Sequence, residues 1–233
     1  MVDLTAEMAG LWAALGPAPA HRGRVLQFVA ATSGEGTSTV AREFARLAAV
    51  RARRPVWLVD ADLTGQGQQE AVSAQSDRFG RLAKPSYASP DGSCFFTVSP
   101  RLTAKDGRPV PAARLLLAQA CLGGRLWVTR LRTDALRAGQ RIEALPDARY
   151  WDAMRKHAET VVVDAPSLDR SDLCITLAPY MDATIIVVAA ETTRASEPIA
   201  LRDEIEAVGG RIAGVVMNRS TYQPPGLLRK VLG

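Results

Sequence analysis

Residues 31–38 read Ala-Thr-Ser-Gly-Glu-Gly-Thr-Ser, and their surroundings restrict the fold more than any other stretch of this chain. They follow an apolar run at 25–30 and precede a segment at 39–48 whose apolar residues recur with helical spacing. A strand, a Gly-rich loop and a helix in this order are the context of a phosphate-binding loop. Backbone amides of such a loop, together with the helix N-terminus, form an anion site. The segment therefore predicts a phosphate-binding α/β protein.

The loop departs from the pattern G-x-x-x-x-G-K-[ST] at its cation. Ala31 stands at the first glycine and Thr37 at the lysine, whereas Gly36 and Ser38 fit. The lysine of the pattern reaches the β- and γ-phosphates, and the Ser/Thr hydroxyl binds Mg²⁺. We therefore expect ATP or ADP with Mg²⁺, bound weakly because Thr37 carries no charge. The predicted cofactor-binding residues are Gly34, Glu35, Gly36, Thr37, Ser38 and Thr39.

Composition limits the class of protein further. With 233 residues the chain fits one α/β domain with a full core. The net charge of +5 comes mainly from arginine, which we attribute to codon bias, and the arginines form no run, so no nucleic acid is expected as a partner. Three cysteines without C-x-x-C spacing indicate buried thiols in a reducing compartment. The N-terminus lacks a basic region, and the apolar run 183–190 is too short to span a bilayer, so we expect a cytoplasmic protein.

Continuous apolar runs separated by helical segments predict a mostly parallel sheet with helices on both faces, the three-layer fold of P-loop NTPases. Strands are expected at 25–30, 56–59, 160–163, 183–188 and 212–217. Residues 1–20 are predicted to form an N-terminal helix (4–15) and a linker, and residues 21–233 a single domain. The stretch 64–114, rich in Gly, Ser, Gln and Pro, is expected to be an irregular excursion with one strand candidate at 94–98.

Three aspartates end predicted strands. Asp60 and Asp62 follow the second strand in Val-Asp-Ala-Asp-Leu, and Asp164 ends a later one in Val-Val-Val-Asp-Ala-Pro. Carboxylates at the C-terminal ends of parallel strands lie where an open α/β sheet binds its ligand. We expect these three aspartates to be catalytic, and Ser38, Asp60 and Asp164 to hold Mg²⁺. The alternative is that a strand-ending aspartate only caps the following loop or helix.

Together these segments resemble the bacterial tyrosine kinases of capsule and exopolysaccharide assembly, which belong to the MinD/ParA-like P-loop proteins. Residues 33–39 resemble the family's P-G-E-G-K-S-T loop, residues 59–63 its D-x-D-L-R motif, and residues 163–166 its D-x-P motif. The closing pattern is matched by Ser171-Asp172, Asp182, Val187-Val188 and Gly214-Val215-Val216-Met217-Asn218. The resemblance covers most of residues 5–220, except 64–114. It implies a P-loop fold, binding of ATP with Mg²⁺, and a membrane co-polymerase or chain-length protein as partner.

The departures from the family indicate reduced activity. Thr37 replaces the loop lysine, Ser33 its proline, and Thr64 the arginine of D-x-D-L-R. The segment 7–13 aligns with the ring-forming E-x-x-R-x-x-R motif but lacks both arginines, which weakens the prediction of a homo-oligomer. Tyr222 is the one tyrosine of the tail 220–233, where the autokinases carry a cluster. We therefore expect a pseudokinase.

Three functions stay open at this point. The favoured one is an accessory protein of polysaccharide export, peripheral to the inner membrane through its co-polymerase partner. The first alternative is an active ATP-dependent tyrosine kinase whose missing cation comes from Arg24, Arg42 or Arg46 folding back, or from another subunit. The second is a MinD/ParA-like positioning ATPase, which Thr32 at the signature-lysine position argues against. Trp12 is expected to pack on its own domain, with docking to a partner helix as the alternative.

Overall fold

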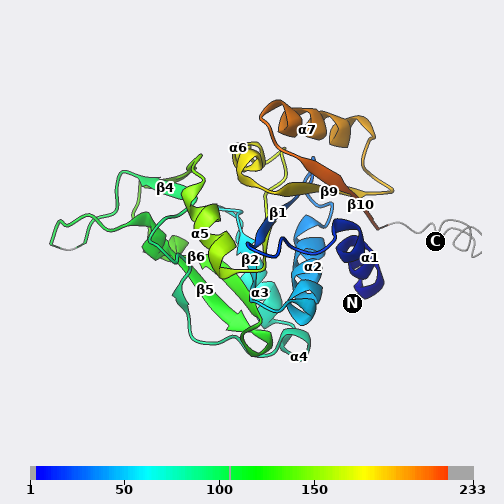
Figure 1. Ribbon diagram of the computed structural model, residues 1–233. Coiled ribbons are helices and arrows are strands. Elements are labelled where there is room, and N and C mark those ends of the chain that lie inside the picture. The colour runs from blue at the N-terminus through cyan, green and yellow to red at the C-terminus, as the bar shows by residue number, and fades with distance from the viewer. Residues whose placement is uncertain (1–3, 105, 220–233) are drawn as a thin grey trace, which may run out of the picture.

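The computed structural model describes residues 4–104 and 106–219, which are organised around a central eight-stranded sheet (Figure 1). The strand order is β10-β9-β1-β8-β2-β6-β5-β3. The strands expected from the apolar runs are all present: β1 (Arg24–Val29), β2 (Val56–Asp60), β8 (Thr160–Asp164), β9 (Ala183–Ala189) and β10 (Ile212–Asn218). Every pairing among these five is parallel. The predicted fold class, a mostly parallel sheet of the P-loop type, is confirmed.

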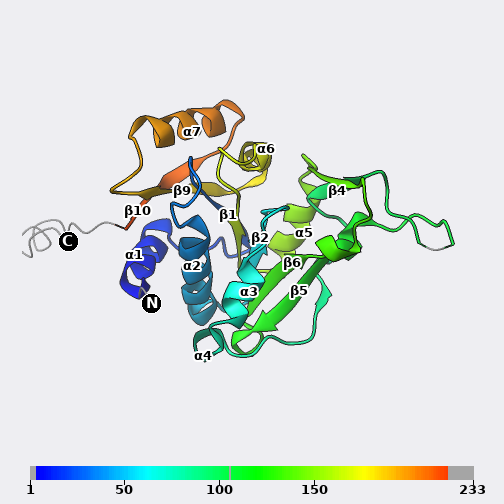
Figure 2. The same ribbon diagram turned by 180° about the vertical axis from the view of Figure 1, so that it is seen from behind.

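Helices cover both faces of this sheet (Figures 1 and 2). Alternate residues of β1 enter two different apolar clusters: Leu26 and Phe28 join the cluster with α2, whereas Val25 joins the cluster with α5 and α6. A third cluster lies between β9 and α7. The helices are α1 (Thr5–Leu15), α2 (Thr37–Arg51), α3 (Gln68–Ser73), α4 (Ser76–Phe79), α5 (Arg149–His157), α6 (Leu173–Leu177) and α7 (Ser196–Ala207). Within the described ranges, none of them has the length and apolar character needed to cross a membrane.

The sheet continues beyond β2 into a part that the sequence did not predict. Strand β6 (Leu126–Leu131) pairs in parallel with β2, and β5 (Leu116–Cys121) and β3 (Ser86–Tyr87) follow in antiparallel pairing. The predicted strand candidate at 94–98 appears as β4 (Phe96–Ser99), paired with β7 (Arg141–Ala144). Short 3₁₀ turns lie in this part, η1 (Ala112–Leu115), η2 (Leu122–Gly124) and η3 (Thr133–Ala135), and another, η4 (Ala178–Tyr180), follows α6. The excursion 64–114 is therefore less irregular than expected, since it holds α3, α4, β3, β4 and η1.

The N-terminal helix packs on the domain that follows it. The ring of Trp12 lies 5.9 Å from that of Phe44 on α2, and the guanidinium of Arg24 stands 4.9 Å from the centre of the Trp12 ring. Arg24 also donates a hydrogen bond to the carbonyl of Gly16, at 2.7 Å. A cation over an aromatic face, together with this hydrogen bond, fixes the helix and the start of its linker. Trp12 thus packs on its own domain, as expected. The tail with Tyr222 lies outside the described residues.

Candidate functional site

Parallel pairing brings the Gly-rich loop and the strand-ending aspartates to one edge of the sheet. In the register of the strands, Phe28 of β1 and Asp60 of β2 both pair with Asp164 of β8. The loop follows β1 directly, so it lies beside these strand ends, where open α/β sheets bind ligands. A cavity of ≈ 240 Å³ opens there, lined by five of the six predicted loop residues and by Asp62, Asp164, Arg170 and Arg219.

The loop keeps the backbone shape of an anion cradle. Gly34 and Gly36 have φ values of 87° and 90°, a conformation that glycine adopts at little cost. A Cβ atom at Gly36 would lie 2.1 Å from the side-chain nitrogen of Asn218, which donates a hydrogen bond to the carbonyl of Glu35 at 2.7 Å. In the described part of the chain, the backbone amides from Gly34 to Ser38 donate to no acceptor. Five successive unpaired amides at the start of a helix form a nest for an anion.

Glu35 contributes to this cradle through its backbone alone. Its side chain is 4% exposed and does not line the cavity, within the described residues. Burial raises the pKa of its carboxyl, and contacts with Thr193, Ala189 and Thr32 only partly oppose that effect. The predicted binding role of Glu35 is therefore limited to its amide.

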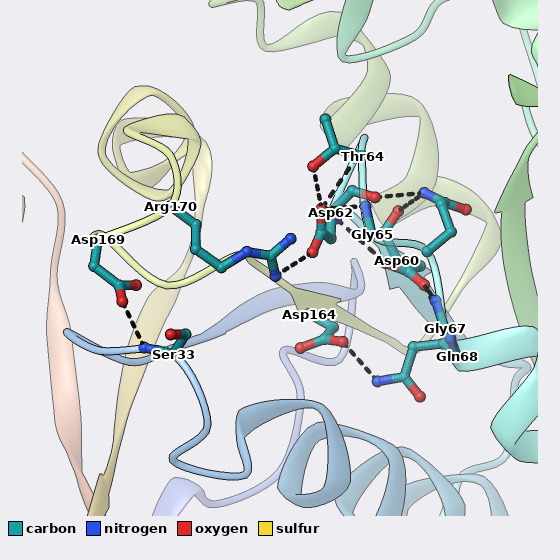
Figure 3. Close-up of polar contacts among 11 residues, drawn as sticks. Ser33, Asp60, Asp62, Thr64, Gly65, Gly67, Gln68, Asp164, Asp169 and Arg170 are labelled. Atoms are coloured by element: carbon teal, nitrogen blue, oxygen red, sulfur yellow. Dashed lines mark hydrogen bonds and ion pairs between the residues drawn. The ribbon is translucent and has the colours of Figure 1, made fainter.

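Asp164 presents an unpaired oxygen beside the loop. One carboxylate oxygen accepts a hydrogen bond from the side-chain amide of Gln68 at 2.6 Å (Figure 3). The same amide also donates to the carbonyl of Ser38 at 2.8 Å. The other oxygen, Oδ1, is buried and has no partner among the described residues. Burial raises the pKa of Asp164 to about 6, although Gln68 and Ser38 lower it.

This oxygen and the Ser38 hydroxyl suit a magnesium ion. Mg²⁺ in phosphate sites is held by one or two protein oxygens, with water and phosphate oxygens completing the octahedron. The described residues contain no cluster of three or more acidic, His or Cys side chains able to hold a metal by themselves. A metal would therefore depend on the phosphates as ligands, which is the arrangement expected beside a phosphate-binding loop.

Asp60 serves chiefly as a cap. One of its carboxylate oxygens accepts hydrogen bonds from the amides of Gly67 and Gln68, at 2.9 and 3.0 Å, where α3 begins. The other accepts one from the amide of Asp62 at 3.2 Å. Burial and the nearby charge of Asp164 raise the pKa of Asp60 to about 7, while these amides lower it. The capping alternative thus holds for Asp60, and its role as catalytic residue and Mg²⁺ ligand stays a prediction.

Asp62 is bound to an arginine that the sequence analysis did not single out. One carboxylate oxygen accepts hydrogen bonds from the backbones of Thr64 and Gly65, and the other lies 2.6 Å from Nη1 of Arg170 (Figure 3). Burial acts to raise the pKa of Asp62, but the amides of Gly65 and Thr64 and the charge of Arg170 outweigh it, so the pKa is lowered. Asp62 is therefore an ionised aspartate that already has a counter-charge.

The arginines proposed as substitutes for the lysine all have partners outside the cavity, although the charge of Arg42 does act on Asp164, where it partly offsets the rise in pKa that burial causes. Arg24 contacts Trp12 and Gly16, Arg42 donates to Gln68 at 3.1 Å, and Arg46 pairs with Glu43 at 3.0 Å. None of the three lines the cavity in the part of the chain that the structure describes. Sequence reasoning missed Gln68, Arg170 and Arg219. The partners of Gln68 and Arg170 are remote in sequence, and the turn 167–172 right after Asp164 was the available signal for Arg170.

Comparisons with known proteins agree with this fold. Scans against models of protein families and against curated proteins give no match. Among solved structures, the chain is similar to the kinase domain of VpsO, with 19% identity, a TM-score of 0.54, and coverage of 85% of this chain and 86% of that one. It is also similar to the kinase domain of the Escherichia coli tyrosine kinase ETK, with 14% identity, a TM-score of 0.56, and coverage of 88% and 70%.

A third similar structure carries ligands. Cobyrinic acid a,c-diamide synthase from Mycobacterium smegmatis, with bound ADP and magnesium, shares 17% identity and a TM-score of 0.50, with coverage of 83% of this chain and 71% of that one. At such identities the likeness establishes the fold. The resemblance to bacterial tyrosine kinase domains is thus confirmed at the level of the fold, and nucleotide with magnesium is bound by a protein that shares it.

Replacing Asp164 with Asn should stabilise the protein in alkaline buffer. The pKa of Asp164 is raised from 3.8 in the unfolded chain to about 6, so its contribution to stability is full below pH 3.8 and is lost as pH rises through about 6. Asn cannot ionise, and its oxygen still accepts the hydrogen bond from Gln68. In urea unfolding with EDTA, Asp164→Asn should gain about 2 kcal/mol over wild type at pH 8 and lose this advantage towards pH 4.

The exposed Asp203, which pairs with Arg202 on α7, provides the control. Asp203→Asn should change the free energy of unfolding by less than about 0.5 kcal/mol at either pH. An Asp164→Asn variant that is less stable than wild type at pH 8 would contradict the view that this carboxylate is an uncompensated buried charge.

Proposed function

We propose that this chain binds ATP or ADP with Mg²⁺ in the cavity at the Gly-rich loop and transfers phosphate slowly or not at all. The observation that carries this proposal is the set of groups left without partners in the described residues: the amides of residues 34–38 and Oδ1 of Asp164. The amides suit phosphate oxygens, and the carboxylate oxygen suits the metal. The loop residues and Asp164 line the same cavity, so phosphate and metal can bind side by side although Thr37 carries no charge.

The chain's own residues divide the work at this site. The loop amides bind and orient the phosphates, and Ser38 and Asp164 hold the metal, whose charge offsets that of the phosphates when it is bound. Gln68 keeps Asp164 in place through its 2.6 Å hydrogen bond. Losing one preorganised charged contact to a phosphoryl group costs about 3 kcal/mol in the transition state, or about a hundredfold in rate. This cost favours binding with little turnover over an efficient kinase.

We place this nucleotide-binding protein in capsule or exopolysaccharide assembly, as a cytoplasmic partner of a membrane co-polymerase. The support is the set of motifs shared with the bacterial tyrosine kinases, together with a fold like those of the VpsO and ETK kinase domains. The segment 7–13, which lacks the two arginines of the ring motif, lies in α1 and packs on α2. A partner protein, and not a ring of identical subunits, would then bring the chain to the inner membrane.

An active tyrosine kinase is the second candidate, and one observation favours it. Arg170 places a cation at the cavity, where the sequence indicated none. The positioning-ATPase alternative lacks comparable support. Thr32, at the signature-lysine position, has no charge to offer a nucleotide, and its hydroxyl donates a hydrogen bond to Glu197 at 3.2 Å.

Restoring the lysine should strengthen nucleotide binding. In Thr37→Lys the new ammonium group reaches the β- and γ-phosphates, so calorimetry should show Mg²⁺-ADP binding about tenfold or more tighter than in wild type. Val50→Lys, at an exposed position near the C-terminal end of the same helix α2, is a matched control that adds the same charge away from the cavity and should leave the affinity within about threefold.

The same two proteins separate the candidate functions. Incubation with Mg²⁺-ATP and a tyrosine-containing peptide should give little phosphotyrosine with wild type. Efficient phosphorylation by wild type would favour the kinase alternative over the accessory role. An affinity for Mg²⁺-ADP that Thr37→Lys leaves unchanged would contradict a phosphate site at this loop.

The proposed partner is tested by capture. The tagged full chain, incubated with detergent-solubilised membranes of its own source, should retain a membrane-spanning protein of polysaccharide assembly that binds the purified chain directly. Direct binding should be measured again with that protein's cytoplasmic segments alone. Failure to retain any such protein, with nucleotide binding intact, would overturn the accessory role and leave the nucleotide site standing.

A further inference from the structure

The cavity at the Gly-rich loop has two cations in its lining, Arg170 and Arg219. Neither corresponds to the lysine of a phosphate-binding loop, whose position Thr37 occupies. No described lysine lines the cavity either. If nucleotide phosphates bind here, these two arginines are the cationic side chains of the described lining that can contact them, in addition to the backbone amides and the metal.

The backbone of Arg170 is tied to the start of the loop. The amide of Leu168 donates to the carbonyl of Ala30 at 3.1 Å, and the amide of Asp169 donates to the carbonyl of Ala31 at 3.2 Å. The Asp169 carboxylate in turn accepts a hydrogen bond from the amide of Ser33 at 3.0 Å. These three contacts hold the residue before Arg170 directly against the loop, so the position of the arginine is preorganised.

The side chain of Arg170 extends from this anchored segment toward Asp62 (Figure 3). Its Nη1 lies 2.6 Å from the Asp62 carboxylate, and the side chain is 44% exposed. Partial exposure leaves the guanidinium free to reorient, and a half-exposed ion pair is a weak tether. A phosphate group, with more oxygens and more charge, competes well for a guanidinium, which binds phosphate in a bidentate manner.

We propose that Arg170 is the phosphate-contacting cation of this site and that it exchanges Asp62 for phosphate oxygens when nucleotide binds. This inference rests on the proposed nucleotide-binding function and names the residue that makes it feasible without the loop lysine. Asp62 is then a positioning residue for Arg170. Asp62 also accepts hydrogen bonds from the backbone amides of Thr64 and Gly65, so its carboxylate stays in position after Arg170 moves to the phosphate.

Arg170 suits this role better than Arg219. Asp62, the partner of Arg170, lies just beyond the end of β2 and lines the same cavity as Asp164, whose charge it affects and whose Oδ1 would hold the metal. Arg219 follows β10, and its neighbour Asn218 contacts the loop at the carbonyl of Glu35. An arginine beside the carboxylates is placed for the terminal phosphates that share the metal.

The test is calorimetric titration of the full chain with ADP, with and without Mg²⁺. Arg170→Gln should weaken ADP binding at least about tenfold, and Arg170→Lys should restore part of it. The control Arg202→Gln, on α7 outside this cavity, should change it less than about threefold, and Arg219→Gln should weaken it less than Arg170→Gln does. Asp62→Asn keeps an oxygen for the two amides but releases the guanidinium, so it should tighten ADP binding without Mg²⁺. Thermal unfolding of each variant shows that it is folded.

A second background separates a phosphate contact from a structural role. In Thr37→Lys the restored lysine supplies the positive charge. Adding Arg170→Gln to this variant should therefore weaken ADP binding less than about threefold. An equal loss in both backgrounds, or an unchanged affinity in Arg170→Gln, overturns the inference while the nucleotide site stands. If the wild-type protein binds no ADP at millimolar concentration, the proposed function itself is overturned. This result can be told apart from the two outcomes that overturn only the role of Arg170.

Discussion

The site depends on the parallel pairing of β8 between β1 and β2. Asp164 pairs with Phe28 on one side and Asp60 on the other, so the Gly-rich loop and the strand-ending carboxylates meet at one edge. In a strand a shift of one residue turns every side chain to the opposite face. Because β8 is buried on both faces, with different residues in the two apolar clusters, packing selects this register and so creates the cavity.

The electrostatics of this edge are dominated by buried carboxylates. Asp60 and Asp164 are buried neighbours, and burial raises the pKa of both carboxyls. Asp62, by contrast, has Arg170 as its partner and a lowered pKa. At Asp164 the charge of Arg42 offsets the effect of burial only in part, and Oδ1 has no donor among the described residues. A metal ion brought with the nucleotide, and an arginine that can move to the phosphates, would supply the charge that Thr37 does not.

The sequence predicted the elements whose signals are local and missed the contacts that are not. Continuous apolar runs identified β1, β2, β8, β9 and β10, and the two loop glycines have the conformation that the motif requires. The hairpin of β5 and β6 was missed because polar Gln119 and Thr129 interrupt its apolar runs; Thr129 faces inward to accept the amide of Asp60. Gln68 and Arg170 were missed because the residues they contact, Asp164 and Asp62, lie about a hundred positions away.

The central claim is that the backbone amides of this loop bind nucleotide phosphate without a loop lysine. Its most direct test is to follow the amide resonances of the ¹⁵N-labelled chain by NMR while ADP and Mg²⁺ are added. The resonances of Gly34 to Ser38 should shift the most and saturate together, as hydrogen bonds to phosphate form. Loop resonances that stay unchanged at saturating ADP, or shifts confined to another surface, would contradict the claim.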